Sequence, residues 1–187
     1  NTKTARKAVI IRGNIKMDRN IGLITGAASG IGLRTVKRLL KKGWEIYGLD
    51  NDKNGLEQSS GEIDNSNYIA KPCDLRSEEA LKKIFAEIQK NQQKINALIA
   101  CAGVLKLGTL EDMSTEDFDA VFDINVRGLW LSAREALPFL KNAASHGELS
   151  RIILLSSVSA LRPKIDSGAY SASKAAVSQL TRVLSVE

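Results

Sequence analysis

The sequence predicts an α/β protein in three layers, with a doubly wound parallel sheet between two layers of helices. Two observations carry this prediction. Short apolar runs alternate with helical patterns along the chain, which is the order that βαβ units require. The 187 residues, 43% of them hydrophobic, also suit one domain and leave little room for a second. Right-handed crossovers between successive strands would then give an open sheet.

Five short apolar runs are expected to form the strands of this sheet. They are Ile21–Thr25, Glu45–Leu49, Tyr68–Lys71, Ala97–Ala100 and Arg151–Leu155. The first helix is expected over Ile31–Lys42, ended by Gly43, because glycine commonly closes a helix.

Three further helices follow the third, fourth and fifth strands. Ser77 is a suitable N-cap for a helix that carries Leu81, Ile84, Phe85 and Ile88 at three- and four-residue spacing. Ser114 followed by Asp117 resembles a capping box at the start of a long helix to about Leu140. The last helix begins around Tyr170 and runs to the end of the sequence.

The net charge of +6 is concentrated in the first 16 residues, which hold five basic and no acidic side chains. The other 171 residues carry 22 basic and 21 acidic side chains. Because a nucleic-acid binder shows a basic stripe on its folded domain, a nucleic-acid partner is not expected. Residues 1–16 are interpreted as a leader or an expression-derived arm, and residues 17–187 as the domain.

Cysteine usage and hydropathy narrow the protein class further. Cys73 and Cys101 lack a CxxC partner, which favours a reduced, cytoplasmic protein without a cysteine metal site. The single histidine, His146, has no ligand partners close by, so no metal is expected. The longest apolar run, 98–105, is far shorter than the roughly 20 residues that a membrane span needs. A membrane partner is therefore not expected.

A glycine-rich turn joins the first strand to the first helix, with the sequence TGAASGIG over residues 25–32. Glycine adopts the positive φ angles of a tight turn, and bare N–H groups at a helix N-terminus attract a pyrophosphate. The spacing is GxxxGxG, which differs from the GxGxxG fingerprint. An ordinary glycine-rich strand-to-helix turn is the alternative.

Asp50 supports the nucleotide interpretation of this turn. It follows the second strand, 18 residues after Gly32, where an acid accepts hydrogen bonds from the adenosine ribose. A carboxylate there repels a 2′-phosphate, and neither Ser29 nor Asn51 offers a compensating charge, so NAD is favoured over NADP. The alternative is an acid exposed to solvent in a turn.

Tyr170 and Lys174 are four residues apart on the last expected helix, so their side chains share a face. An ammonium close to a phenol favours the phenolate, which would make the phenol useful as an acid and base near neutral pH. Ser157 follows the fifth strand, at the edge where ligands bind in open α/β sheets. Ordinary surface and turn roles remain the alternatives for these three residues.

Taken together, these motifs resemble the short-chain dehydrogenase/reductase family from Ile21 to Glu187. The ordered set is Thr25–Gly32, Asp50, Cys73-Asp74-Leu75, Ala102-Gly103, Asn125-Val126-Arg127-Gly128, Ser157 and Tyr170-Ser171-Ala172-Ser173-Lys174. The resemblance implies a Rossmann-type fold, which here would be incomplete at its C-terminus. It also implies homodimers or homotetramers for the full-length protein.

The resemblance also implies a role for each site residue. Tyr170 would be the catalytic acid and base, Lys174 would lower its pKa and hold the nicotinamide ribose, and Ser157 would polarise the reacting carbonyl. Asn125, in a bend of the long helix, would anchor a water molecule. The implied cofactor-binding residues are Gly26, Ser29, Gly30, Ile31, Gly32, Asp50, Asp74, Leu75, Ala102, Gly103, Tyr170 and Lys174.

Two departures from the family pattern affect these expectations. Cys101 stands where the family commonly has an asparagine, and it is expected to be a small buried residue. The family's strands and substrate loop beyond Glu187 are not in this sequence, so this chain alone is expected to be poorly active. Ala102–Leu105 and Leu161–Pro163 resemble members that oxidise cyclic dihydrodiols.

Two functional hypotheses follow. The first is an oxidoreductase that transfers a hydride between NAD(H) and a secondary alcohol or carbonyl substrate, with Tyr170 as acid and base. The alternative is a catalytically impaired dinucleotide-binding or regulatory module that lacks the substrate loop.

Overall fold

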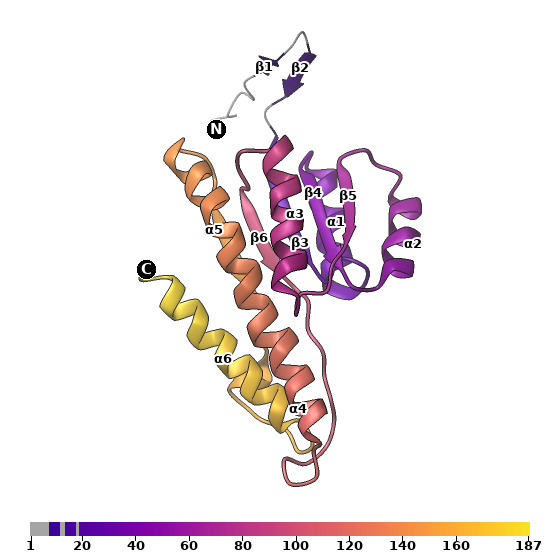
Figure 1. The fold of residues 1–187 in the computed structure, drawn as a ribbon, viewed down its shortest axis with the longest axis vertical. Coiled ribbons are helices and arrows are strands. Elements are labelled where there is room, and N and C mark those ends of the chain that lie inside the picture. Colours follow the sequence, from indigo (N-terminus) through magenta and orange to yellow (C-terminus); the bar gives the residue numbers. More distant parts are fainter. Residues whose placement is uncertain (1–7, 12–13, 18) are drawn as a thin grey trace.

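A computed structural model describes residues 8–11, 14–17 and 19–187. Its centre is a parallel sheet with the strand order β5-β4-β3-β6-β7, flanked by helices (Figure 1). The strands are β3 (Ile21–Thr25), β4 (Glu45–Asp50), β5 (Tyr68–Pro72), β6 (Ala97–Ala100) and β7 (Arg151–Leu154). The predicted doubly wound sheet is therefore confirmed, and each expected strand lies within one residue of its predicted bounds.

The two faces of the sheet bury separate hydrophobic cores. On β3, Leu23 packs into a core with side chains of the helices α3 (Glu78–Asn91) and α5 (Leu129–Ser145). The adjacent Ile24 packs on the other face against α1 (Gly30–Lys41) and α2 (Lys53–Ile63). Both residues are fully buried, because side chains alternate between the faces of a strand. This arrangement leaves the carboxyl ends of the strands as the edge from which the loops project.

Three helices agree closely with the expected ones. They are α1 (Gly30–Lys41), α3 (Glu78–Asn91) and α6 (Gly168–Leu184). Gly43, with a φ of 77°, follows the last turn of α1. The Ser77 hydroxyl caps α3 by accepting a hydrogen bond from the Ala80 N–H at 3.1 Å.

Helix α2 (Lys53–Ile63) was not predicted from the sequence. It contains two glycines and two serines, which are poor helix formers, and it buries only Leu56 and Ser59. Its N-terminus is nevertheless well capped, because the Asp52 carboxylate accepts a hydrogen bond from the Gly55 N–H at 3.0 Å.

The long helix expected between Ser114 and Leu140 is interrupted. The structure has α4 (Thr115–Phe122), a π-helical segment η1 (Asp123–Gly128) and α5 (Leu129–Ser145). The π-helical form of η1 was not predicted, but η1 contains Asn125, where the family resemblance implied a bend of the long helix. The extra residue of the wider turn directs both Asn125 and Gly128 into the interior, and a Cβ on Gly128 would come within 2.9 Å of the Leu75 Cβ. The π-helical turn is therefore packed closely against the segment that holds Leu75.

Ser114 caps α4 as expected, because its hydroxyl accepts a hydrogen bond from the Asp117 N–H at 3.1 Å. The Asp117 carboxylate instead pairs with Lys106 at 2.9 Å. No element was expected before residue 17, but β1 (Ala8–Ile11) and β2 (Asn14–Met17) pair there as an antiparallel hairpin. The boundary between residues 16 and 17 stays a prediction, and residues 1–7 and 12–13 lie outside the described ones. Among the helices of the described ranges, none combines the length and the apolar character needed to cross a membrane.

Candidate active site

The turn after β3 requires glycine for both conformation and space. Gly26 and Gly30 have φ angles of 70° and 53°, which other residues adopt at a cost. A Cβ on Gly32 would lie 1.9 Å from the Gly26 carbonyl oxygen, whereas a Cβ on Gly30 would meet nothing within 4 Å. The turn is thus closed tightly on its inner side and open at Gly30.

The N-terminus of α1 faces this open side without a side-chain cap. Its N-cap residue, Ser29, makes no capping hydrogen bond, and the first turn holds no acid. The helices α2, α3 and α4 all have side-chain caps. The first N–H groups of α1 and the positive end of its dipole are therefore available to an anion.

Asp50 ties the turn to the end of β4. One carboxylate oxygen accepts a hydrogen bond from the Ala28 N–H at 3.0 Å, and the other accepts from the Asp52 N–H at 3.1 Å. A carboxylate offers about four acceptor positions, so capacity remains for donors such as ribose hydroxyls. The Asp50 side chain is therefore held in a fixed position beside the turn.

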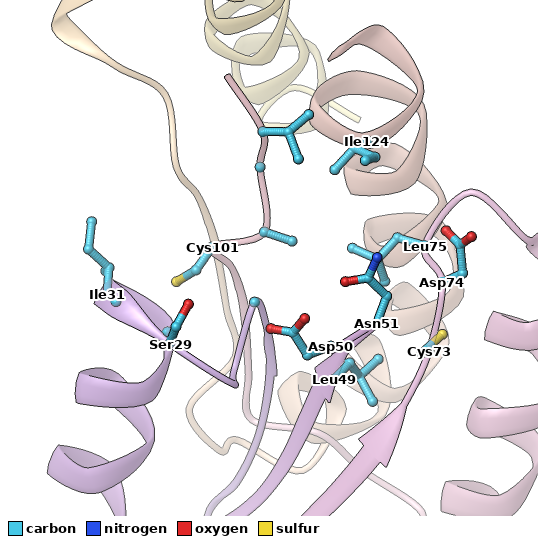
Figure 2. A pocket seen from close by; sticks show the side chains of 16 residues that line it. Ser29, Ile31, Leu49, Asp50, Asn51, Cys73, Asp74, Leu75, Cys101 and Ile124 are labelled. Atoms are coloured by element: carbon cyan, nitrogen blue, oxygen red, sulfur yellow. The ribbon is translucent and has the colours of Figure 1, made fainter. Parts of the chain in front are cut away.

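These features surround a cavity of about 450 Å³ at the carboxyl edge of the sheet, which we call the turn cavity. Figure 2 shows the side chains of Ser29, Asp50 and Cys101 around it. All ten of the expected cofactor-binding residues other than Tyr170 and Lys174 line it: Gly26, Ser29, Gly30, Ile31, Gly32, Asp50, Asp74, Leu75, Ala102 and Gly103. Residues expected from separate motifs thus meet at one site.

Six further lining residues were not expected as binding residues: Leu49, Asn51, Cys73, Cys101, Val104 and Ile124. Five of them adjoin an expected residue in the sequence, so wider boundaries around each motif would have found them. Ile124 adjoins no expected cofactor-binding residue but directly precedes the expected catalytic residue Asn125, and η1 brings it to the cavity (Figure 2).

Asp74 lies at the side of the turn cavity formed after β5. Its carboxylate pairs with Arg76, with an Nη2–Oδ2 distance of 2.7 Å, and both side chains are partly exposed. The hydrogen bonds from Arg76 lower the pKa of Asp74. Asp74 is therefore a carboxylate at neutral pH, able to accept a hydrogen bond.

The two thiols at the cavity are desolvated. Burial raises the pKa of both Cys73 and Cys101 to about 11, so neither is a thiolate at neutral pH. Cys101 is half-buried rather than buried as expected, but its raised pKa agrees with the expectation that it is not a reactive thiol.

Tyr170 and Lys174 share one face of α6, as their spacing predicted. The Lys174 Nζ lies 5.7 Å from the centroid of the Tyr170 ring, and its hydrogen bond to the Leu155 carbonyl oxygen is 2.8 Å long. Lys174 is only 4% exposed, and burial lowers its pKa. The ammonium is therefore fixed near the phenol by a short contact with the end of β7.

Asn125 is fully buried in η1 and holds the chain that follows β6. Its Oδ1 accepts a hydrogen bond from the Val104 N–H at 2.8 Å, and its Nδ2 donates to the Val104 carbonyl oxygen at 2.9 Å. Nδ2 also donates to the Ser173 hydroxyl at 3.0 Å. We call Asn125, Tyr170, Ser173 and Lys174 the α6 cluster.

Gly103 lies between the α6 cluster and the turn cavity. A Cβ there would be 3.1 Å from the Asn125 Oδ1 and 3.4 Å from the Lys174 Nζ. Because Gly103 also lines the turn cavity, the two sites adjoin at this residue.

Ser157 follows β7 and is the N-cap of the short 3₁₀ helix η2 (Val158–Ala160). Its hydroxyl accepts a hydrogen bond from the Ser159 N–H at 3.1 Å, and η2 packs against α6. The turn role considered from the sequence is therefore present. The hydroxyl proton is not used by this contact and can be donated.

Comparison with known proteins agrees with this geometry. Residues 20–187 match the family model described as short chain dehydrogenase. The chain belongs to the short-chain dehydrogenase family. The family resemblance and the Rossmann-type fold expected from the motifs are thereby confirmed.

Two curated relatives illustrate this membership. The chain is 31% identical over 173 residues to a 2,3-dihydro-2,3-dihydroxybenzoate dehydrogenase of Bacillus subtilis, covering 91% of this chain and 65% of the relative. It is 33% identical over 171 residues to an NAD-dependent glycerol dehydrogenase of Listeria innocua, covering 89% and 64%. The chain thus spans just under two thirds of the length of these relatives.

Two solved structures are also similar. A 3-ketoacyl-(acyl-carrier-protein) reductase of Brucella melitensis, complexed with NADH, superimposes with a TM-score of 0.83 at 32% identity, covering 89% of this chain and 69% of that one. The RhlG/NADP active-site complex of Pseudomonas aeruginosa gives 0.82 at 26% identity, covering 88% and 65%. Both nicotinamide dinucleotides therefore occur among the similar structures.

The residues of the turn cavity fit a nicotinamide dinucleotide. The uncapped helix N-terminus suits a pyrophosphate, and Asp50 suits ribose hydroxyls. Where Gly30 lines the cavity, its missing side chain leaves room for a ligand to approach the backbone.

Proposed function

We propose that the protein is an oxidoreductase that uses NAD(H) to interconvert a secondary alcohol and its carbonyl compound. One observation carries the proposal: the turn cavity, which fits a dinucleotide, meets the α6 cluster at Gly103. The cofactor, when bound, supplies the chemistry of hydride transfer.

The proposed proton path uses the side chains of this chain. Tyr170 gives a proton to the substrate oxygen during reduction and removes it during oxidation. Lys174, fixed by the Leu155 carbonyl, places a positive charge near the phenol and thereby favours the phenolate. Ser157 donates its free hydroxyl proton to the substrate oxygen.

Asn125 is proposed to help replace the proton that Tyr170 uses. Its Oδ1 accepts one hydrogen bond from Val104, so a second lone pair is available for a water molecule on the side of Gly103 and Lys174. The water would connect the Lys174 ammonium with solvent.

The preference for NAD is proposed from the charges at the cavity. Asp50 would repel the 2′-phosphate of NADP, and the residues that line the described cavity include no lysine or arginine. A homodimer or homotetramer, a cytoplasmic location and a small-molecule substrate complete the proposal. A cyclic dihydrodiol is a specific substrate to test, given the similarity to the Bacillus subtilis dehydrogenase.

The test is turnover of secondary alcohols, cyclic dihydrodiols included, by the full-length protein with NAD and with Tyr170→Phe as the comparison. We expect NADH formation by the native protein and a loss of about 100-fold or more in the variant, in the range of general acid–base catalysis. NADH binding, measured by fluorescence, should be retained in the variant.

Equal turnover by both proteins would contradict the assignment of Tyr170. Binding of NADH without turnover of any alcohol or ketone would favour the alternative, a dinucleotide-binding or regulatory module.

A further inference from the structure

Ser173 is a buried polar residue in the turn of α6 between Tyr170 and Lys174, and the mechanism above does not use it. Its exposed fraction is 0%. Its hydroxyl donates to the Tyr170 carbonyl oxygen at 2.7 Å and accepts from the Asn125 Nδ2 at 3.0 Å. A serine hydroxyl has one proton, so the donation to Tyr170 leaves an oxygen lone pair for Asn125.

The contact with Tyr170 alone would be unremarkable, because serine often bonds to a carbonyl one turn earlier in its helix. The contact with Asn125 is different, since it joins α6 to η1 across 48 residues of sequence. Both hydrogens of the Asn125 Nδ2 are then used, one by Ser173 and one by the Val104 carbonyl.

The Asn125 amide also holds the backbone of residues 103–104, which lies between the two sites. It binds both the N–H and the carbonyl of Val104, and the adjacent Gly103 is the residue at which the turn cavity meets Lys174. Without the Ser173 hydroxyl, one Asn125 N–H would be unpaired at a position with no exposure to water. Such groups are costly, so the amide would turn or shift to find a partner.

We propose that Ser173 is a positioning residue: its hydroxyl fixes the Asn125 amide and thereby sets the Gly103–Val104 chain against Tyr170 and Lys174. It touches neither the substrate nor the cofactor. The inference rests on the proposed function, because the geometry that it preserves is that of the proposed proton path.

The first experiment compares Ser173→Ala, Ser173→Thr and the matched control Ser132→Ala in the full-length protein. Ser132 is also 0% exposed, but its hydroxyl donates only to the Gly128 carbonyl oxygen, four residues earlier at the junction of η1 and α5. We expect kcat to fall about 10- to 100-fold in Ser173→Ala, with the KM for NAD changed by less than about 3-fold. The pH profile of kcat/KM should also shift.

Rescue separates a positioning role from a packing role. Ser173→Thr keeps the hydroxyl and should restore most of kcat and the native pH profile, whereas Ser132→Ala should leave both unchanged. If Ser173→Ala does not fold, Ser173→Cys, which leaves no cavity and replaces the hydroxyl with a weaker donor, takes its place and should show the same losses.

A second measurement does not depend on turnover. The chain has three tyrosines, and burial raises the pKa of Tyr47 and Tyr68. Tyrosinate absorbance of a protein minus that of its Tyr170→Phe form isolates the Tyr170 titration without cofactor. We expect its midpoint to move by about half a pH unit or more in Ser173→Ala, which is roughly 0.7 kcal/mol, and not in Ser132→Ala.

The outcomes distinguish the inference from the function on which it rests. If Ser173→Ala or Ser173→Cys folds and matches the control in kcat, pH profile and tyrosinate midpoint, the positioning role is wrong. If Tyr170→Phe keeps native turnover, the proposed function fails instead. A moved midpoint in a protein without turnover would support the positioning role of Ser173 and contradict the proposed catalysis.

Discussion

The turn cavity and the α6 cluster adjoin at Gly103 but are built in different ways. The cavity presents backbone N–H groups and small residues. Its turn is packed so tightly that a single Cβ added at Gly32 would collide with the Gly26 carbonyl oxygen. In the α6 cluster, Asn125, Ser173 and Lys174 are buried polar side chains, and their hydrogen bonds join α6, η1 and the segments that follow β6 and β7. The first site should therefore be sensitive to added atoms, and the second to lost polar atoms.

The largest expected effect is at the glycine turn. Gly32→Ala places a Cβ 1.9 Å from the Gly26 carbonyl oxygen, and backbone must move to relieve it. We expect NADH affinity, measured by fluorescence titration, to fall about 100-fold, which corresponds to roughly 3 kcal/mol.

Gly61→Ala is the matched control for this prediction. Gly61 lies within α2, and a Cβ there meets nothing within 4 Å. This variant should be stabilised by about 0.5–1 kcal/mol in urea unfolding, with native NADH affinity. Equal NADH affinity of the two variants would contradict the steric account of the turn.

At alkaline pH, one buried group of each site should change the free energy of unfolding, and the two changes should have opposite signs. Burial raises the pKa of Cys73 from its ordinary 9.0 to about 11, so above pH 9 the unfolded chain holds fewer protons and stability falls until about pH 11. Burial lowers the pKa of Lys174 below its ordinary 10.5. Between this lowered pKa and pH 10.5 the unfolded chain holds more protons than the folded one, so the contribution of Lys174 to stability rises with pH.

Urea unfolding at pH 8, 9, 10 and 11 tests both signs. Cys73→Ala should flatten the alkaline decline by up to about 2 kcal/mol, and Lys174→Met should make it steeper. Parallel pH curves for the native protein and both variants would show that burial of these groups does not control the alkaline stability.

A smaller effect is expected from the acid that faces the turn. Asp50→Asn keeps an oxygen for the Ala28 N–H but loses the negative charge. We expect NADH affinity to fall about 10-fold and the preference for NADH over NADPH to narrow, because the repulsion of a 2′-phosphate is lost.

Asp52→Asn is the control for the charge change, since asparagine also caps a helix well and Asp52 caps α2. It should leave the ratio of NADH to NADPH affinity unchanged. If Asp50→Asn has the same ratio as the native protein, the charge of Asp50 does not select the cofactor.

The smallest effect is expected at the partly exposed pair of Asp74 and Arg76. Arg76→Gln should change the free energy of unfolding at pH 7 by less than about 0.5 kcal/mol, because water screens the pair. The pKa of Asp74 is lowered by Arg76, so NMR titration should show it rising in the variant. Any stability difference should vanish as the pH falls through that pKa.

The core of the turn cavity could be predicted from the sequence, because the glycine turn and Asp50 give local sequence signals. The glycine spacing, the strand before it and Asp50 each act within a few residues of where they occur, and parallel strands bring their carboxyl ends to one edge. The glycine turn and Asp50 could therefore be expected to meet at one edge, the family resemblance added Asp74, Leu75, Ala102 and Gly103, and all of these residues line the turn cavity. Their roles in binding remain predictions.

The α6 cluster could be predicted only in part from the sequence. The four-residue spacing placed Tyr170 and Lys174 on one face, but the partners of Lys174 and Asn125 lie on other elements and leave no local pattern. The family resemblance implied a bend at Asn125, but the π-helical turn itself was not predicted, because helix propensity does not distinguish six residues of wider helix from regular α-helix. Helix α2 was missed because it buries only two residues and so gives a weak apolar pattern, although Asp52 caps its N-terminus.

The π-helical turn has a consequence for how this helix could change. A turn of α-helix needs 3.6 residues, and each residue rotates the chain by about 100°. Deleting one residue from 123–128 could restore regular winding without breaking the helix, yet it would rotate Asn125 away from Val104 relative to everything on α5. Insertions and deletions in this segment, more than substitutions on its surface, would therefore uncouple the two sites while leaving a well-formed helix behind.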